Sequence, residues 1–191
     1  ICDWELRTEL EIEVMYKWVL QNCNKDPTGL AFFLRSLKRR DAIVRVLQEM
    51  RLETFDAGDV VTFQGSLPRK EDGYFCVLSG SCDLVTFPSF SVRLMQLHEA
   101  FRAHRWDAAR EAVLSGTTVC SLGPHAGFGV LSTLTKASYA ASVCAGSGSY
   151  ALNEGSSSAP VGGGGVEPTE ILVVPAAALV LLLFPISFPS R

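Results

Sequence analysis

The sequence predicts a mainly β domain with flanking helices, whose strands form a sandwich, barrel or jelly roll. The first observation is a change of period at residue 51, where apolar residues at helical spacing give way to short β-branched and aromatic runs. The second is that Gly58, Gly65, Gly73 and Gly80 separate these runs, as turn residues do. The third is the return of helical spacing between residues 88 and 116.

Residues 1–50 are predicted to form an N-terminal helical arm. Apolar residues recur at helical spacing from Glu9 to Leu20. Asp26 can cap a second helix that has Pro27 at its first position. Asp41 is predicted to begin a third helix. The apolar face of this third helix consists of Val44, Leu47 and Met50.

The helical stretch 88–116 is interpreted as an insertion between two strands, because it interrupts the β pattern and a further strand follows at Thr117–Leu122. Surface hairpins tolerate such insertions at modest loop-closure cost. Residues 146–168 are rich in glycine and serine and carry little apolar area, so we expect a flexible loop there.

The apolar run from Ile171 to Phe188 has two interpretations. Pro175 divides it into a short strand, Ile171–Val174, and a short helix, Ala176–Phe184, which would close the β domain and leave 185–191 as a tail. Alternatively, its eighteen positions reach the lower limit of about 18–20 residues for a membrane anchor. We favour the strand and helix.

Composition narrows the classes of function. The net charge of −3 gives no electrostatic basis for binding nucleic acid or an acidic membrane. No Cys-x-x-Cys pair occurs, so the cysteines are expected to be reduced thiols in a cytoplasmic protein. The six cysteines are Cys2, Cys23, Cys76, Cys82, Cys120 and Cys144. No nucleophile elbow, zinc-protease motif or phosphate-binding loop is present, and we expect neither enzymatic activity nor a bound metal or cofactor.

Three segments, in this order, resemble the cyclic-nucleotide-binding domain of protein kinase A regulatory subunits, cAMP-activated exchange factors and gated channels. The first is Phe55–Gly65, with its glycine turn, strand and Gln-Gly pair. The second is Tyr74–Val85, with its Leu-Ser-Gly turn between two strands. The third runs from Leu122 to Val143 and falls on the family's phosphate-binding cassette. The resemblance implies a jelly-roll-like antiparallel β-barrel over residues 51–184.

The cassette departs from the family at its two main ligand-holding positions. The family uses a glutamate for the ribose 2′-hydroxyl and an arginine for the phosphate, where this chain has Val130 and Tyr139. Valine accepts no hydrogen bond, and tyrosine offers one neutral donor in place of a charged fork. Lys136 or His125 are alternative sources of positive charge, although both are more simply read as exposed turn residues.

The resemblance implies a regulatory module that senses cAMP or cGMP and acts on a protein partner or an effector domain outside this chain. The alternative is a nucleotide-free interaction or scaffold module that keeps the fold. The ligand-contacting positions implied by the cassette are Gly129, Val130, Leu131, Ser132, Tyr139, Ala140, Ala141 and Ser142. Phe128 is expected to be buried and to anchor the turn.

Overall fold

The structure is a computed structural model that describes residues 7–22, 40–88, 91–146 and 168–183. Its helices are α1 (Glu9–Asn22), α3 (Arg40–Glu49), α4 (Val92–Arg102), α5 (Trp106–Leu114), α6 (Val130–Thr135) and α7 (Ala176–Leu183). Its strands are β1 (Arg51–Phe55), β2 (Val60–Thr62), β3 (Gly73–Ser79), β4 (Cys82–Thr86), β5 (Thr117–Leu122), β6 (Gly127–Phe128), β7 (Ser142–Ala145) and β8 (Thr169–Pro175). The predicted helix after Asp26, most of the predicted loop 146–168 and the tail 185–191 lie outside the described residues.

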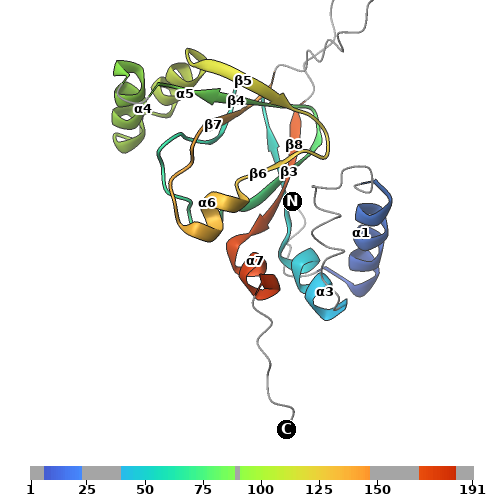
Figure 1. Cartoon of the computed structure of the whole chain (residues 1–191). Coiled ribbons are helices and arrows are strands. Elements are labelled where there is room, and N and C mark those ends of the chain that lie inside the picture. The colour runs from blue at the N-terminus through green and yellow to red at the C-terminus, as the bar shows by residue number, and fades with distance from the viewer. Residues whose placement is uncertain (1–6, 23–39, 89–90, 147–167, 184–191) are drawn as a thin grey trace, which may run out of the picture.

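The strands form two antiparallel four-stranded sheets, in the orders β1-β8-β3-β6 and β2-β7-β4-β5 (Figure 1). This arrangement fits the predicted jelly-roll-like β fold with flanking helices. The predicted closed barrel is not found among the described residues, because β1 and β2 end separate sheets and do not pair with each other. The molecule is therefore described as a sandwich of two sheets.

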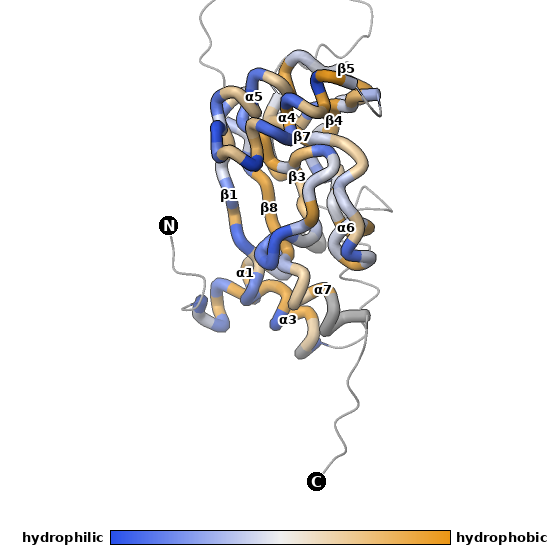
Figure 2. Tube along the Cα trace, turned by 90° about the vertical axis from the view of Figure 1, so that its left-hand side faces the viewer, coloured by the Kyte–Doolittle hydropathy of each residue, from blue (hydrophilic) through white to orange (hydrophobic). Residues whose placement is uncertain are grey.

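The alternation of side chains along β3 divides the apolar residues into two layers. Phe75 and Val77 point into the sandwich, where they join Ile171 and Val173 of β8. Tyr74 and Cys76 point to the opposite face of the same sheet. Figure 2 shows the apolar strand β8 beside the more polar edge strand β1. A strand buried on both faces reads as a continuous apolar run, which is why β8 appears as one in the sequence.

The outer face of the first sheet is covered by α1, α3 and α7. Ile12, Leu47 and Leu179, one from each helix, pack with the outward side chains of β3 and β8. The strand and helix predicted for the C-terminal apolar run are thus present as β8 and α7. Among the described residues, no helix combines the length and the apolar character needed to cross a membrane.

The outer face of the second sheet is covered by α4 and α5, at the end of the molecule opposite α1, α3 and α7 (Figure 1). The sequence predicted one inserted helix, whereas the structure has two. The helical path breaks at His104, which adopts a positive φ of 55°. Leu97 and Val113 are fully buried against this sheet. The imidazole Nε2 of His98 lies 2.8 Å from the carbonyl oxygen of Gln64, which joins α4 to the Gln-Gly turn.

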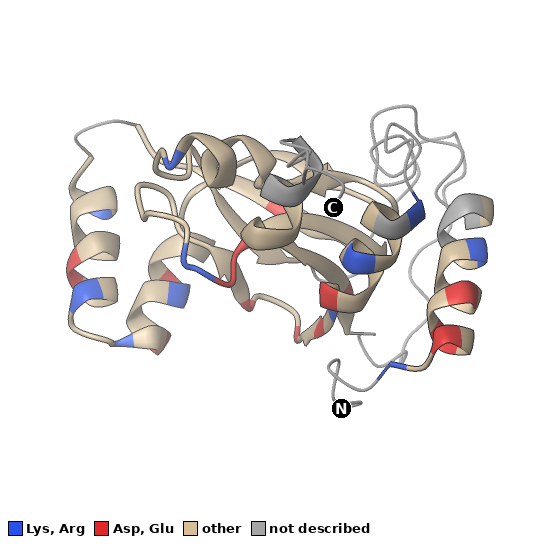
Figure 3. Ribbon diagram, turned by 90° about the horizontal axis from the view of Figure 1, so that it is seen from below, with Lys and Arg blue, Asp and Glu red and all other residues tan. Residues whose placement is uncertain are grey.

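Charged residues lie mainly on the helices at the two ends of the molecule and on connecting loops (Figure 3). Both signs are interspersed on these helices, as in the ion pairs Glu13–Lys17 on α1 and Glu99–Arg105 beside α4. Residues of opposite charge are therefore mixed on these helices.

Candidate functional site

The cassette begins where β6 pairs with the middle of β3. Phe128 of β6 lies opposite Phe75, and their rings stack with centroids 4.9 Å apart. Phe128 packs against the apolar layer inside the sandwich, but it is half-buried and not fully buried as predicted. The reason is that β6 is a two-residue strand at the edge of its sheet, so no further strand covers its side chain. The predicted anchoring role is consistent with the stacking on Phe75.

Gly129 is the residue that turns the chain from β6 into α6. Its φ is +84°, and a Cβ there would lie 2.7 Å from the ring of Phe75 and 2.9 Å from the carbonyl oxygen of Gly73. Both the backbone angle and the space therefore require glycine. One turn later, the hydroxyl of Thr133 donates a 3.1 Å hydrogen bond to the same Gly73 oxygen. The start of α6 is thus fixed against β3 by packing and by a buried hydrogen bond.

The three predicted ligand positions at the start of α6 have different surroundings. Val130 is half-buried and packs against the apolar cluster beneath α1, α3 and α7. Leu131 is 72% exposed. Ser132 is half-buried, and its hydroxyl lies 3.5 Å from the carbonyl oxygen of Ser138. Of the three side chains, that of Val130 packs against the buried apolar cluster.

Tyr139, in the place of the family's arginine, is only 5% exposed. Its hydroxyl donates a 3.0 Å hydrogen bond to Oδ2 of Asp72. Its backbone is paired as well, since its N–H donates to Ser66 and its carbonyl oxygen accepts from Gly65. Burial raises the pKa of the Tyr139 phenol well above its ordinary value, and the neighbouring Asp72 carboxylate raises it further. Tyr139 is therefore a neutral, buried donor with its partner inside the protein.

Asp72 is the buried partner of Tyr139 that the sequence does not indicate, because Glu71-Asp72 has the composition of an ordinary polar turn. Its side chain is 4% exposed. Oδ2 accepts a 2.9 Å hydrogen bond from the backbone N–H of Arg69, and the Arg69 guanidinium lies 3.0 Å from Oδ1. The Asp72 carbonyl oxygen accepts a 3.1 Å hydrogen bond from the N–H of Ala176 at the start of α7. Asp72 thus connects the end of the cassette, the loop before β3 and the C-terminal helix.

The three small residues at the end of the cassette pass from the surface into the core. Ala140 is exposed, Ala141 is half-buried and Ser142 is fully buried at the start of β7. The Ser142 hydroxyl accepts a 2.9 Å hydrogen bond from the backbone N–H of Gln64. The Ser142 side chain therefore binds the segment that follows β2 to the start of β7, while Ala140 is the position open to solvent.

The two alternative sources of charge lie in turns. Lys136 is exposed at the C-terminal end of α6, with a φ of +58°. His125 is half-buried, and its backbone N–H donates a 2.7 Å hydrogen bond to the carbonyl oxygen of Val77. No group of three or more histidine, cysteine, aspartate or glutamate side chains within the described residues is placed to hold a metal ion.

No protein-family model and no curated protein sequence matches the chain. Solved structures do match. The regulatory domain of Toxoplasma gondii PKA with cAMP superposes with a TM-score of 0.52 at 14% identity, over 92% of this chain and 46% of that one. A mutant regulatory subunit of a cAMP-independent protein kinase A from Trypanosoma brucei, bound to cAMP, gives 0.51 at 14% identity, over 92% and 45%. The chain has the fold of a cyclic-nucleotide-binding domain.

A third structure, PKAR CBD2 bound to Sp-2Cl-cAMPS, has a TM-score of 0.50 at 12% identity. The match covers 93% of this chain and 81% of that one. The chain spans about half the length of the Toxoplasma and Trypanosoma chains. The resemblance inferred from the three sequence segments is thereby confirmed at the level of the fold. Of the predicted ligand positions, Val130, Leu131 and Ser132 lie in α6 and Ser142 begins β7, whereas Gly129 lies between β6 and α6, and Tyr139, Ala140 and Ala141 precede β7.

Proposed function

We propose that the chain is a regulatory module of the cyclic-nucleotide-binding type whose cassette keeps its backbone form but binds cyclic nucleotide weakly. The observation that carries this proposal is the hydrogen bond of the Tyr139 hydroxyl, which is the only donor of that side chain and is directed to Asp72. Val130 supports it, since its side chain packs against an apolar cluster and has no polar atom. Neither residue supplies what the family's glutamate and arginine supply to a ribose and a phosphate.

The expected affinity follows from the two missing contacts. Hydrogen bonds to charged groups contribute roughly 1.5–3 kcal/mol each, so the loss of two weakens binding by about 3–6 kcal/mol. This corresponds to a factor on the order of 10²–10⁴ in the dissociation constant. A site that would be micromolar with both residues is therefore expected to bind cAMP or cGMP no more tightly than high micromolar.

The solved relatives favour a ligand of this class. The Toxoplasma domain was solved with cAMP. The Trypanosoma protein was solved as a triple mutant bound to cAMP, and one of its substitutions replaces a threonine with an arginine. We expect the output of the module to be a contact with a protein partner or an effector domain, and no catalysis by the module itself.

A nucleotide-free interaction module is the second candidate, and the buried Tyr139–Asp72 pair favours it. To face a ligand, the Tyr139 hydroxyl would have to leave a carboxylate that is 4% exposed. Leaving a buried acceptor without one of its donors costs roughly 1–3 kcal/mol. The contact therefore stabilises the cassette in a form that needs no ligand.

Isothermal titration of the purified chain with cAMP and cGMP tests the proposal. The natural chain should bind each nucleotide no more tightly than high micromolar. The double variant Val130→Glu with Tyr139→Arg should bind at least about tenfold more tightly, because it regains two hydrogen bonds to charged groups. A tenfold gain is a conservative fraction of the binding free energy expected from these two bonds. The matched control is Val130→Leu with Tyr139→Phe, which changes the same positions without adding charge and should show no gain. A cooperative thermal transition in each variant confirms folding.

Three results would count against parts of this proposal. Tight binding by the natural chain would show that Lys136, His125 or backbone groups hold the phosphate. An equal gain in the control pair would show that charge is not what the cassette lacks. No measurable binding by a folded charged variant would favour the nucleotide-free module, because the pocket would then be closed as well as uncharged.

A further inference from the structure

A groove of about 440 Å³ lies beside the first two turns of α5. Its lining comes mainly from β2, from α4 and α5, and from the loop before β3. The volume falls within the range of about 300–1,000 Å³ that is usual for small-molecule sites. We call this surface the aromatic groove, because three aromatic rings form one of its walls.

The aromatic wall consists of Phe63, which follows β2, Phe101 of α4 and Trp106, which begins α5. The ring centroids of Phe63 and Phe101 are 4.8 Å apart, and Trp106 lies 5.5 Å from Phe101 and 6.3 Å from Phe63. Trp106 remains 53% exposed although it takes part in both contacts. Because the face of an aromatic ring carries partial negative charge, the exposed indole gives the groove a surface that attracts cations.

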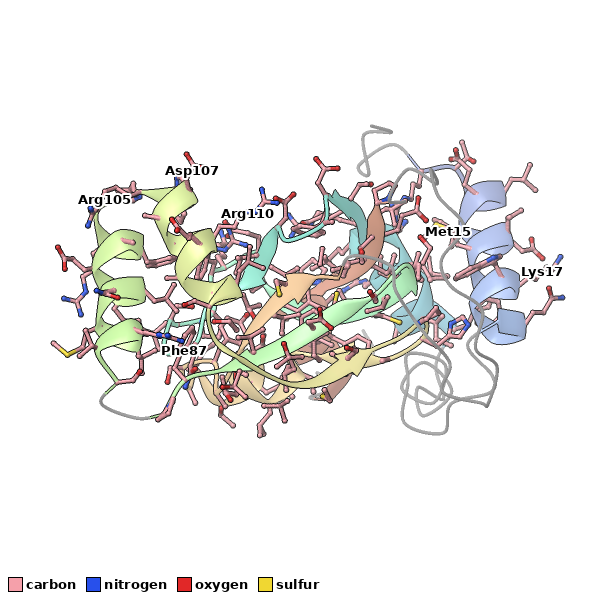
Figure 4. The ribbon with its side chains drawn as sticks, turned by 90° about the horizontal axis from the view of Figure 1, so that it is seen from above. Met15, Lys17, Phe87, Arg105, Asp107 and Arg110 are labelled. Carbon is pink, nitrogen blue, oxygen red and sulfur yellow. The ribbon has the colours of Figure 1, made fainter. Side chains whose placement is uncertain are left out.

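The two arginines that line the groove are each paired with an aspartate that also lines it. Arg110 lies 3.2 Å from Asp59, and Figure 4 shows Arg110 directed from α5 toward the strands. Arg69 lies 3.0 Å from Asp72. Because both positive charges are matched by a carboxylate, the described lining offers no uncompensated positive charge to a phosphate or another anion.

Asp107 is the remaining charged residue of the lining, and it is exposed in the first turn of α5. Within the part of the chain that the structure describes, its carboxylate forms neither an ion pair nor a hydrogen bond. Arg105, two residues earlier, lies 3.5 Å from Glu99 instead. The described lining therefore carries one negative charge in excess, beside the aromatic wall.

An aromatic wall and an excess carboxylate in one groove are complementary to a cation that has an apolar surface. A cation within about 6 Å of a ring centroid is attracted by the face of the ring, most strongly by that of tryptophan, and aromatic pockets recognise quaternary ammonium groups in this way. A primary ammonium group is more strongly hydrated and loses more on leaving water. A metal ion is not favoured, because it requires several oxygen ligands and the groove has one free carboxylate.

We propose that the aromatic groove binds a small molecule with a quaternary ammonium group, which lies against Trp106 and is paired with the carboxylate of Asp107. The apolar methyl groups of the cation contact the rings, and the carboxylate balances its charge. The proposal does not depend on nucleotide binding, because the aromatic groove shares only Tyr139 with the predicted ligand positions of the cassette.

The test is a titration of the ¹⁵N-labelled full chain with choline, followed by the indole N–H signal of Trp106 and the amide signals of residues 101–107. The matched probe is the neutral tert-butyl analogue of choline, in which a carbon atom replaces the nitrogen, so that the shape is kept and the charge is removed. Choline should shift these signals in a saturable manner and bind at least about threefold more tightly than the analogue. Equal affinity of the two probes would overturn the proposal, because the groove would then select an apolar shape alone.

Two variants assign the binding to the residues of the groove. Asp107→Asn removes the charge at nearly constant size and should weaken choline binding about two- to fivefold. Its matched control is Glu111→Gln, because Glu111 is an exposed acid of the same helix that does not line the groove, and this variant should leave the affinity unchanged. Trp106→Leu keeps an apolar side chain without a π face and should weaken binding about threefold or more. If Asp107→Asn has no larger effect than Glu111→Gln, the proposal is wrong.

A short peptide with a central trimethyllysine tests a second source of the same group. If this peptide binds at least about tenfold more tightly than choline, the ligand is a modified segment of a partner protein, and the small-molecule proposal is overturned. Comparable or weaker binding of the peptide supports a small molecule. The absence of saturable shifts at tens of millimolar choline would overturn the proposal too, as would shifts confined to β5 or the cassette.

Discussion

The hydrogen bond between Tyr139 and Asp72 can be removed without changing the shape of either residue's surroundings, by Tyr139→Phe. The two side chains are 5% and 4% exposed, so the contact is not screened by solvent. A hydrogen bond to a charged group contributes roughly 1.5–3 kcal/mol. Asp72 keeps the backbone N–H and the guanidinium of Arg69 as donors. We therefore expect a loss near the lower end of that range, about 1.5–2 kcal/mol in the free energy of unfolding.

Urea unfolding followed by circular dichroism at neutral pH measures this loss. Thr62→Val is the matched control, because it also removes one buried hydroxyl, but one that has no hydrogen-bond partner. It should leave the free energy of unfolding unchanged or raise it. If Tyr139→Phe costs less than about 0.5 kcal/mol, or no more than Thr62→Val, the Tyr139–Asp72 bond does not stabilise the fold, and the argument that it holds the cassette in a ligand-free form fails.

Three further predictions concern the turn into α6, the helical pair and the buried thiols. Gly129→Ala should cost at least about 1–3 kcal/mol in urea unfolding, because alanine at a φ of +84° is strained and its Cβ would contact the ring of Phe75 at 2.7 Å; a neutral result would contradict the positive φ. Leu97→Ala should cost about 2–5 kcal/mol and shift the single unfolding transition of the whole chain; a separate transition would mean that α4 and α5 unfold independently of the sheets. Burial raises the pKa of Cys82 to about 12 and that of Cys144 to about 11. The thiols of the unfolded chain ionise near pH 8.5, whereas the buried thiols stay protonated. The free energy of unfolding is therefore independent of these two thiols below that pH. Above it, this free energy should fall by roughly 1.4 kcal/mol per pH unit for each thiol. Cys82→Ala should reduce the slope between pH 9 and 10.5, and an unchanged slope would contradict the burial of this thiol.

The sequence predicted most strands correctly because their signals are local. Glycine turns separate β2, β3 and β4, and a continuous apolar run marks β8, which is buried on both faces. The break between α4 and α5 at His104 was not predicted, since positive φ is uncommon outside glycine and no glycine or proline marks the turn. The choice between a sandwich and a closed barrel stayed open, because β1 and β2 each satisfy the strand pattern whether or not they pair.

The cassette depends on a contact between residues far apart in the sequence, which local sequence patterns do not predict. The resemblance to the family placed Tyr139 at the arginine position, but its partner Asp72 lies 67 residues earlier. The segment around Asp72 reads as an ordinary turn, and nothing in it signals a buried carboxylate. The ring contact between Phe63 and Trp106 is similar, because these residues come from separate segments that only the folded chain brings together.

The backbone form of the cassette depends on contacts within the protein. The turn at Gly129 is fixed by the Phe75 ring and by Thr133, whose hydroxyl bonds to Gly73. None of these groups is one that the family directs at a ribose or a phosphate. The neutral phenol of Tyr139 donates to Asp72 and places no positive charge in this buried position. These contacts need no ligand, so the backbone form of the cassette is not by itself a sign of ligand binding.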